Sequence, residues 1–182
     1  ALDDRYFKVN ATANSATASG DNAVAIGQSV TSDGSSSIAM GSGTTASGLH
    51  STALGASAAN ASGLERQTAV GGGASTGAYR ATAVGALASA QGTSAIALGD
   101  SAGASGANAI ALGRTASAST GNAIAIGNGA IADNGTIPGT TGSIAIGGGA
   151  RAGGVDSIAI GTNARHSGSG ATVLGGSASA MG

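Results

Sequence analysis

The chain has 182 residues, a formal net charge of −1 and 35 glycines, and only 8% of its residues are charged. This composition excludes an ordinary core of large side chains, and the near-zero charge argues against charge-driven disorder and against a basic surface for nucleic acid. The absence of cysteine excludes disulfides and thiolate metal sites. No apolar run reaches the roughly 18 residues of a membrane-spanning helix, so we expect any export or anchoring segment to lie outside these residues.

Residues 1–21 differ from the rest of the chain. They include Tyr6 and Phe7, two of the three aromatic residues. We predict that residues 3–10 form a strand that caps the first coil of the structure and covers an open sheet edge. Residues 1–21 are therefore expected to be an N-terminal strand or cap.

Residues 22–182 contain a hexapeptide that recurs eleven times, with sequences such as NAVAIG, SAIALG, NAIAIG and DSIAIG. Eight of the ten intervals between its terminal glycines are equal, as from Gly99 to Gly113, which gives a 14-residue period. The other two intervals, from Gly55 to Gly71 and from Gly127 to Gly147, are longer. A fixed period of this length is typical of a solenoid, and the longer intervals are typical of surface insertions. We expect these insertions near residues 63–66 and 133–141.

One repeat, residues 108–121 (NAIALGRTASASTG), shows the local structure. Ile110 and Leu112 are two apart, so in a strand they share one face, and Ala109 and Ala111 take the other. Residues 116–119 alternate small apolar with small polar side chains and predict a second short strand.

Glycines follow each predicted strand, at Gly113 and Gly121 in this repeat. Glycine tolerates the positive φ angles of tight turns. Each coil is therefore predicted as strand, turn, strand, turn, with coils stacked as parallel strands about 4.8 Å apart. The sequence thus predicts an all-β solenoid, a rod about 50 Å long for eleven coils.

Alanine positions face the interior of this predicted roll, because larger side chains would hold the two sheets too far apart for the short turns. The branched side chains then face outward as two columns. A monomer would expose them as one long apolar stripe, larger than soluble monomers usually show. We infer a subunit interface formed by Val24, Ile26, Ile38, Met40, Leu54, Val70, Val84, Ile96, Leu98, Ile110, Leu112, Ile124, Ile126, Ile144, Ile146, Ile158, Ile160 and Leu174.

The hexapeptides NAVAIG, NAIAIG and DSIAIG, followed by strands of small residues, resemble the head repeat of YadA-like trimeric autotransporter adhesins. The resemblance covers about residues 22–182. It implies a left-handed parallel β-roll of 14-residue coils that assembles as a homotrimer through the branched columns. It also implies a bacterial cell-surface head, the exposed passenger of an outer-membrane-anchored protein. Such heads bind host extracellular matrix or host cells.

No catalytic, cofactor-binding or metal-binding constellation is predicted. His50 and His166 lie eight repeats apart, about 40 Å along the rod, and each is expected to be a solvated residue. The scattered carboxylates make none of the spaced pairs that glycosidases use. The chain is therefore predicted not to be an enzyme and to need no cofactor, and its arginines, including Arg151 and Arg165, are expected to project from turns as solvated charges.

Two other classes of solenoid remain as alternatives. Hexapeptide acyltransferases repeat aliphatic-glycine units, but their triangular coils hold about three hexapeptides each, so their period is longer than this one. They also carry a catalytic histidine beside an insertion loop. Ice-binding solenoids need a flat array of outward threonines. Here Thr52, Thr68 and Thr82 align in only three adjacent coils.

The longer insertion is the candidate ligand-binding loop. Asn134 and Gly135 form a strong turn dipeptide, and Pro138 is the only proline in the chain and cannot donate to a β-ladder. In a trimer the loop would occur three times around the rod, which favours multivalent attachment. The candidate contact residues are Asp133, Asn134, Thr136, Ile137, Pro138 and Thr140.

Overall fold

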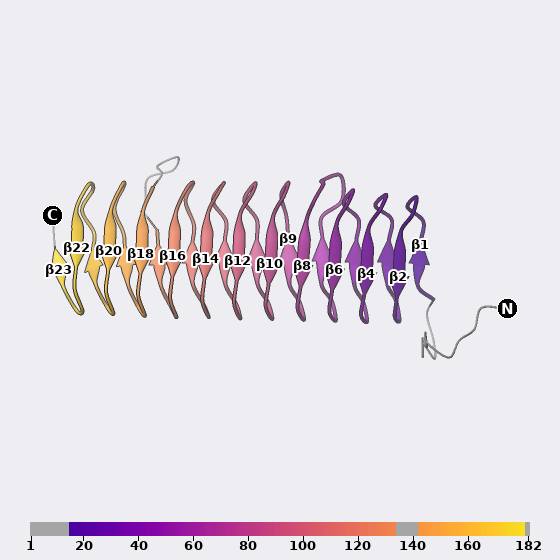
Figure 1. Ribbon diagram of the computed structural model, residues 1–182, viewed down its shortest axis with the longest axis horizontal. Helices are drawn as coiled ribbons and strands as arrows, with labels where there is room; N and C mark the ends of the chain where they lie inside the picture. The colour runs from indigo at the N-terminus through magenta and orange to yellow at the C-terminus, as the bar shows by residue number, and fades with distance from the viewer. Residues whose placement is uncertain (1–14, 134–141, 181–182) are drawn as a thin grey trace.

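The computed structural model describes residues 15–133 and 142–180. In these residues the chain winds into a solenoid with no helix, in which short parallel strands stack along one long axis from β1 at one end to β23 at the other (Figure 1). The strands form two sheets, one of twelve odd-numbered strands and one of eleven even-numbered strands. We call these the odd sheet and the even sheet. The all-β solenoid predicted from the period is confirmed.

The even sheet is built from the hexapeptides. Its three-residue strands are β2 Val24–Ile26, β4 Ile38–Met40, β6 Thr52–Leu54, β8 Thr68–Val70, β10 Thr82–Val84, β12 Ile96–Leu98, β14 Ile110–Leu112, β16 Ile124–Ile126, β18 Ile144–Ile146, β20 Ile158–Ile160 and β22 Thr172–Leu174.

The odd sheet is built from the small-residue segments between the hexapeptides. Its two-residue strands are β1 Thr17–Ala18, β3 Thr31–Ser32, β5 Thr45–Ala46, β7 Ala59–Asn60, β9 Ser75–Thr76, β11 Ser89–Ala90, β13 Gly103–Ala104, β15 Ser117–Ala118, β17 Ile131–Ala132, β19 Arg151–Ala152, β21 Arg165–His166 and β23 Ser179–Ala180. The first of these lies in the segment expected as a cap, and residues 3–10 of that segment lie outside the described residues.

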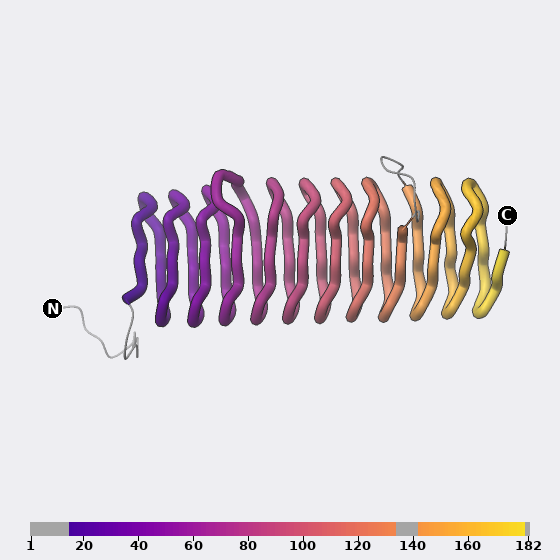
Figure 2. The backbone as a smooth tube through the Cα atoms, turned by 180° about the vertical axis from the view of Figure 1, so that it is seen from behind, coloured from indigo at the N-terminus to yellow at the C-terminus, as the bar shows by residue number. Residues whose placement is uncertain are grey.

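The register between coils is the same throughout the rod. Each strand pairs in parallel with the strand one repeat away, as in Ile110↔Ile124. The pairing continues across the shorter of the two long intervals, with Leu54↔Val70, and across the longer one, with Ile126↔Ile146. The strand pairs therefore keep the same register on both sides of each insertion. The first widens one turn at the edge of the rod between β7 and β8 (Figure 2).

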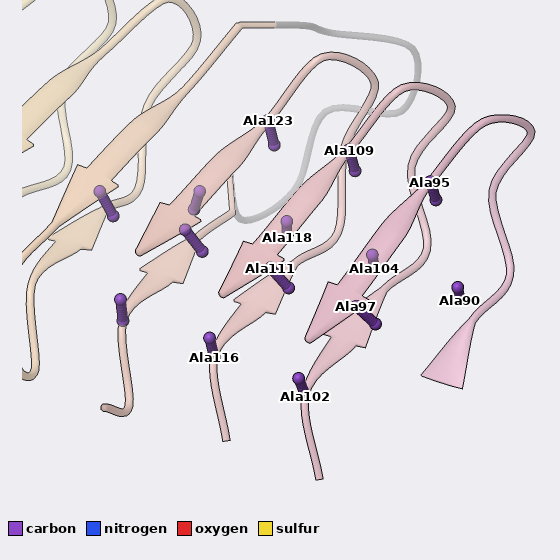
Figure 3. Packing of buried hydrophobic residues seen from close by; sticks show 14 of the residues in the cluster. Ala90, Ala95, Ala97, Ala102, Ala104, Ala109, Ala111, Ala116, Ala118 and Ala123 are labelled. Atoms are coloured by element: carbon purple, nitrogen blue, oxygen red, sulfur yellow. The ribbon is translucent and has the colours of Figure 1, made fainter. Parts of the chain in front are cut away.

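The core is a stack of alanines between the two sheets. Ala97, Ala111 and Ala125 of the even sheet have no exposed area, and Ala104 and Ala118 of the odd sheet are at 1% or less. The methyl groups of Ala97, Ala104, Ala111 and Ala118 point into the thin space between the strands (Figure 3). Because each coil closes with short turns, this space is thin, and alanine methyl groups fill most of its positions. The predicted inward position of the alanines is confirmed.

The interior of the N-terminal half also contains polar side chains, which the repeat did not predict. The buried hydroxyls of Ser32 and Ser37 lie 2.7 Å apart, and the buried Asn60 side-chain amide donates to the Thr76 hydroxyl at 2.9 Å. The Gln67 amide donates to the Thr76 carbonyl at 3.3 Å. Buried polar groups are tolerated when they find such partners.

The turns use left-handed backbone at two repeating positions. The first is the leading residue of the hexapeptide, with φ of 56° at both Asn108 and Asn122, and the second lies two residues after its glycine, with φ of 53° at Thr115. A positive φ was expected at Gly121, but it falls on Asn122. Asparagine tolerates this region better than most residues, which explains its place at the start of the motif. The Asn108 amide also donates to Asn122 Oδ1 at 3.3 Å.

The terminal glycine of the hexapeptide is required for two reasons. All eleven of these glycines have φ between 118° and 134°, a region that side chains rarely adopt. In addition, a Cβ on Gly113 would lie 2.5 Å from the carbonyl oxygen of Gly127 in the next coil. The glycine column therefore sets the closeness of stacking.

We expect Ala125→Leu to destabilise the fold by about 1–3 kcal/mol, because overpacking a filled core has a cost of that size and Ala125 is fully buried. The change is measured as a drop in melting temperature by circular dichroism. Ala107→Leu is the matched control, because Ala107 is exposed and its turn position holds Leu49 and Tyr79 in other coils. Equal melting temperatures for the two variants would contradict the assigned interior.

Candidate functional site

The outer face of the even sheet is mostly aliphatic, with threonine at the first position of four strands. The first and third residues of each three-residue strand point away from the alanine core, and in-register pairing aligns them as two columns. All residues of the predicted interface lie in these columns. Those classed as exposed in the isolated chain, among them Ile96, Leu98 and Leu174, keep 38% to 66% of their surface accessible.

The outer face of the odd sheet has a different composition. The first residues of its strands are mostly Thr, Ser, Ala or Gly, and one row consists of Thr17, Thr31 and Thr45. On the even sheet, Thr52, Thr68 and Thr82 form another row of three. Neither threonine row extends beyond three coils. One sheet of the rod is thus apolar outside, and the other is small and polar.

The candidate ligand-binding loop is described only at its first residue. Asp133 follows β17 directly and is half-buried. Asn134, Thr136, Ile137, Pro138 and Thr140 lie outside the described residues. Their contact with a ligand stays a prediction.

The smaller insertion, near residues 63–66, forms one wall of a concavity of about 260 Å3. Leu49 and Tyr79 of the neighbouring coils line it and are exposed. The Tyr79 hydroxyl donates to the Gly63 carbonyl at 3.4 Å. Glu65 forms an ion pair with Arg66 at 3.3 Å.

The two histidines have different surroundings. His50 is exposed, as expected. His166 is only 4% exposed, so its expected position in solvent is wrong. It is the second residue of β21, which points inward, and its register neighbours Ala152 and Ala180 are alanines. His166 Nδ1 accepts a hydrogen bond from the Gly168 N–H at 2.9 Å, and Nε2 has no partner among the described atoms.

Arg151 and Arg165 were expected to project from different turns, and this is wrong. Each is the first residue of an odd-sheet strand, β19 and β21, and they are in-register neighbours. Both side chains are exposed on the outer face. The sequence signal was available, because the two residues are one 14-residue repeat apart.

Over residues 15–133 and 142–180, no group of three His, Cys, Asp or Glu side chains is close enough to hold a metal ion. The same residues contain no helix long and apolar enough to cross a membrane. The features that distinguish this surface are therefore the aliphatic face, the insertions and the arginine pair.

The sequence matches the family described as the YadA head domain repeat. The matched segments are residues 10–29, 32–58, 77–102, 90–116, 104–130 and 141–164, which span most of the chain. A search among curated proteins gave no match. The matched segments consist of the coils described above, in which alanines fill the interior. The chain therefore belongs to the family of YadA head domain repeats, which are surface-exposed heads of the adhesin type.

Proposed function

We propose that this chain is the head of a trimeric autotransporter adhesin on a bacterial surface, and that it attaches the bacterium to host cells or extracellular matrix. Three copies pack together through the outer face of the even sheet. The parent protein is anchored in the outer membrane through a part outside these residues. The head acts by binding, without catalysis and without a cofactor.

The observation that supports this proposal most strongly is the aliphatic face of the even sheet. A continuous apolar surface of this length is typical of a protein interface. Burying it removes roughly 25 cal/mol of unfavourable hydration for each Å2 covered. The odd sheet is the complementary face, because its small polar side chains suit contact with water. Three chains joined through the even sheet would all present the odd sheet and the insertions outward.

Light scattering of the purified chain tests the assembly. One chain has a mass of 16.4 kDa, and the expected mass of the particle is three times that value. Binding of the same sample to a panel of matrix proteins and host cells tests attachment. A folded and stable 16.4 kDa monomer would contradict the proposal.

We expect deletion of residues 134–139 to weaken attachment without destabilising the head. The deletion restores the 14-residue period, and the ladder pairs on both sides of the insertion are already in register. Loop-closure entropy changes slowly with length, so the melting temperature should change little. Adhesion to cells that bind the unmodified head should fall, because the trimer loses three copies of its candidate contact loop.

A second variant separates the loop's sequence from its length. Residues 134–139 are replaced by an equally long segment of glycine and serine, and adhesion should fall as it does after deletion. If adhesion is unchanged in both variants, the loop is not the binding element, and binding must be assigned to the repetitive outer faces.

A further inference from the structure

The row of outer residues on the odd sheet carries charge at only one place among the described residues. Arg151 and Arg165 are adjacent there, and Ser179 follows in register. Neighbouring parallel strands lie about 4.8 Å apart, so the backbone positions of the two arginines and the serine follow one another at steps of that length. Like charges directly opposite each other on a sheet are destabilising. In the described structure neither guanidinium makes an ion pair or a side-chain hydrogen bond.

A concavity of about 300 Å3 lies at this row. Arg151, Arg165 and Ser179 line it, together with Ser167, which follows β21. The guanidinium groups and the hydroxyls are all hydrogen-bond donors. Two arginine side chains that start from neighbouring strands and line one concavity can both donate to a single oxyanion.

The inner side of the same strand is also exceptional. His166 occupies an inward position whose register neighbours are alanines, so the coil accepts a large buried side chain directly after Arg165. Its Nδ1 accepts from the Gly168 N–H and fixes the turn that carries Ser167. Arg151, Arg165 and His166 thus replace the small residues of the repeat in two adjacent coils. Local departures from the rules of a fold are expected at functional sites.

We propose that Arg151, Arg165, Ser167 and Ser179 form a binding site for an acidic saccharide, with its sulfate, phosphate or carboxylate group between the two guanidinium groups. The concavity is about ten times the roughly 30 Å3 that one water occupies in the liquid, so it accommodates a sugar ring beside the oxyanion. His166 is a positioning residue beneath the site. The site lies within one chain, and only its threefold multiplication on the rod rests on the proposed function.

The test is calorimetric titration of the purified 182-residue protein at 0.15 M NaCl. The probes are N-acetylglucosamine 6-sulfate, glucose 6-phosphate, glucuronic acid, neutral N-acetylglucosamine, inorganic sulfate and hexaglutamate. We expect binding of at least one acidic sugar, weaker binding of inorganic sulfate and no binding of the neutral sugar. No binding of any acidic sugar would overturn the proposal. Tighter binding of hexaglutamate than of every acidic sugar would also overturn it, in favour of an acidic peptide.

The matched variants are R151Q/R165Q and R80Q/R114Q. Both pairs remove two positive charges from exposed arginines, but Arg80 and Arg114 lie in turns of other coils. Loss of charge-assisted hydrogen bonds predicts a decrease in affinity of at least about tenfold for R151Q/R165Q and none for R80Q/R114Q. An equal loss in both pairs would show nonspecific attraction and overturn the proposed site. The titration measures sugar binding alone. A failure of this proposal is therefore distinguishable from a failure of the proposed function, which light scattering and adhesion measure.

Discussion

Replacing Ile126 and Ile146 together by aspartate is expected to abolish the trimer. The two residues are in-register neighbours on the outer face of the even sheet, and both are half-buried in the isolated chain. In the proposed trimer they lie against the other subunits, so the change places two carboxylates per chain in an apolar interface. An unpaired charge buried in this way costs several kcal/mol. Light scattering should show a monomer for the double variant and a trimer for the unmodified chain. If the variant does not fold, circular dichroism should show its unfolding.

The matched control is Ser117→Asp with Ile131→Asp. These residues are also in-register neighbours and half-buried, but they lie on the outer face of the odd sheet. Both double variants therefore add two carboxylates on adjacent strands, and in the control Arg151, the other register neighbour of Ile131, offsets part of the added charge. We expect the control to remain trimeric. A control that dissociates as readily as the even-sheet variant would mean that charge itself, and not its position, disrupts assembly.

Gly113→Ala is expected to destabilise the solenoid by about 3 kcal/mol or more. At φ of +132° an alanine is strained, which costs roughly 1–3 kcal/mol, and the new Cβ would lie 2.5 Å from the Gly127 carbonyl oxygen. To relieve this close contact the two coils must move apart, and the hydrogen bonds between their strands are then weakened. The expected readout is a large decrease in melting temperature and faster amide exchange in the coils on either side.

Gly103→Ala, in the preceding coil, is the control. Gly103 has no positive φ, and a Cβ there would meet nothing within 4 Å. Alanine also restricts the unfolded chain, so this variant should be neutral or slightly stabilising, by up to about 1 kcal/mol. Similar losses of stability for both variants would contradict the role assigned to the glycine column.

The repeat predicted the fold because one constraint acts on every coil. A 14-residue period with alternating Ala and branched positions fixes two strands per coil, the inward face and the in-register stacking. Ile110 and Leu112 on the outside and Ala111 on the inside follow from this alternation alone. A single short apolar segment would not define its secondary structure or its buried face, but eleven copies with the same alternation do.

Features that occur once were harder to predict. Histidine is a polar residue type, which favoured a surface position for His166. Its burial follows only from its register with Ala152 and Ala180. Arg151 and Arg165 were expected in turns, and their place as adjacent outward residues of two strands follows from their separation by one 14-residue repeat. Asn122 has a positive φ at the turn before the hexapeptide strand, a conformation that glycine also adopts. In each case the three-dimensional register, and not the type of residue, decides the outcome.

The unchanged register across both insertions has a consequence for how such heads vary in length. Each coil touches only its two neighbours, so adding or removing one coil moves everything beyond it by about 4.8 Å along the axis without altering the cross-section. The reach of the head is thus adjustable in equal increments by duplicating or deleting the codons of one repeat at a time. Segments of any other length at the edge between β7 and β8 or after β17 leave that reach unaltered, because the ladders continue past them in step. Reach and surface decoration are therefore free to evolve independently.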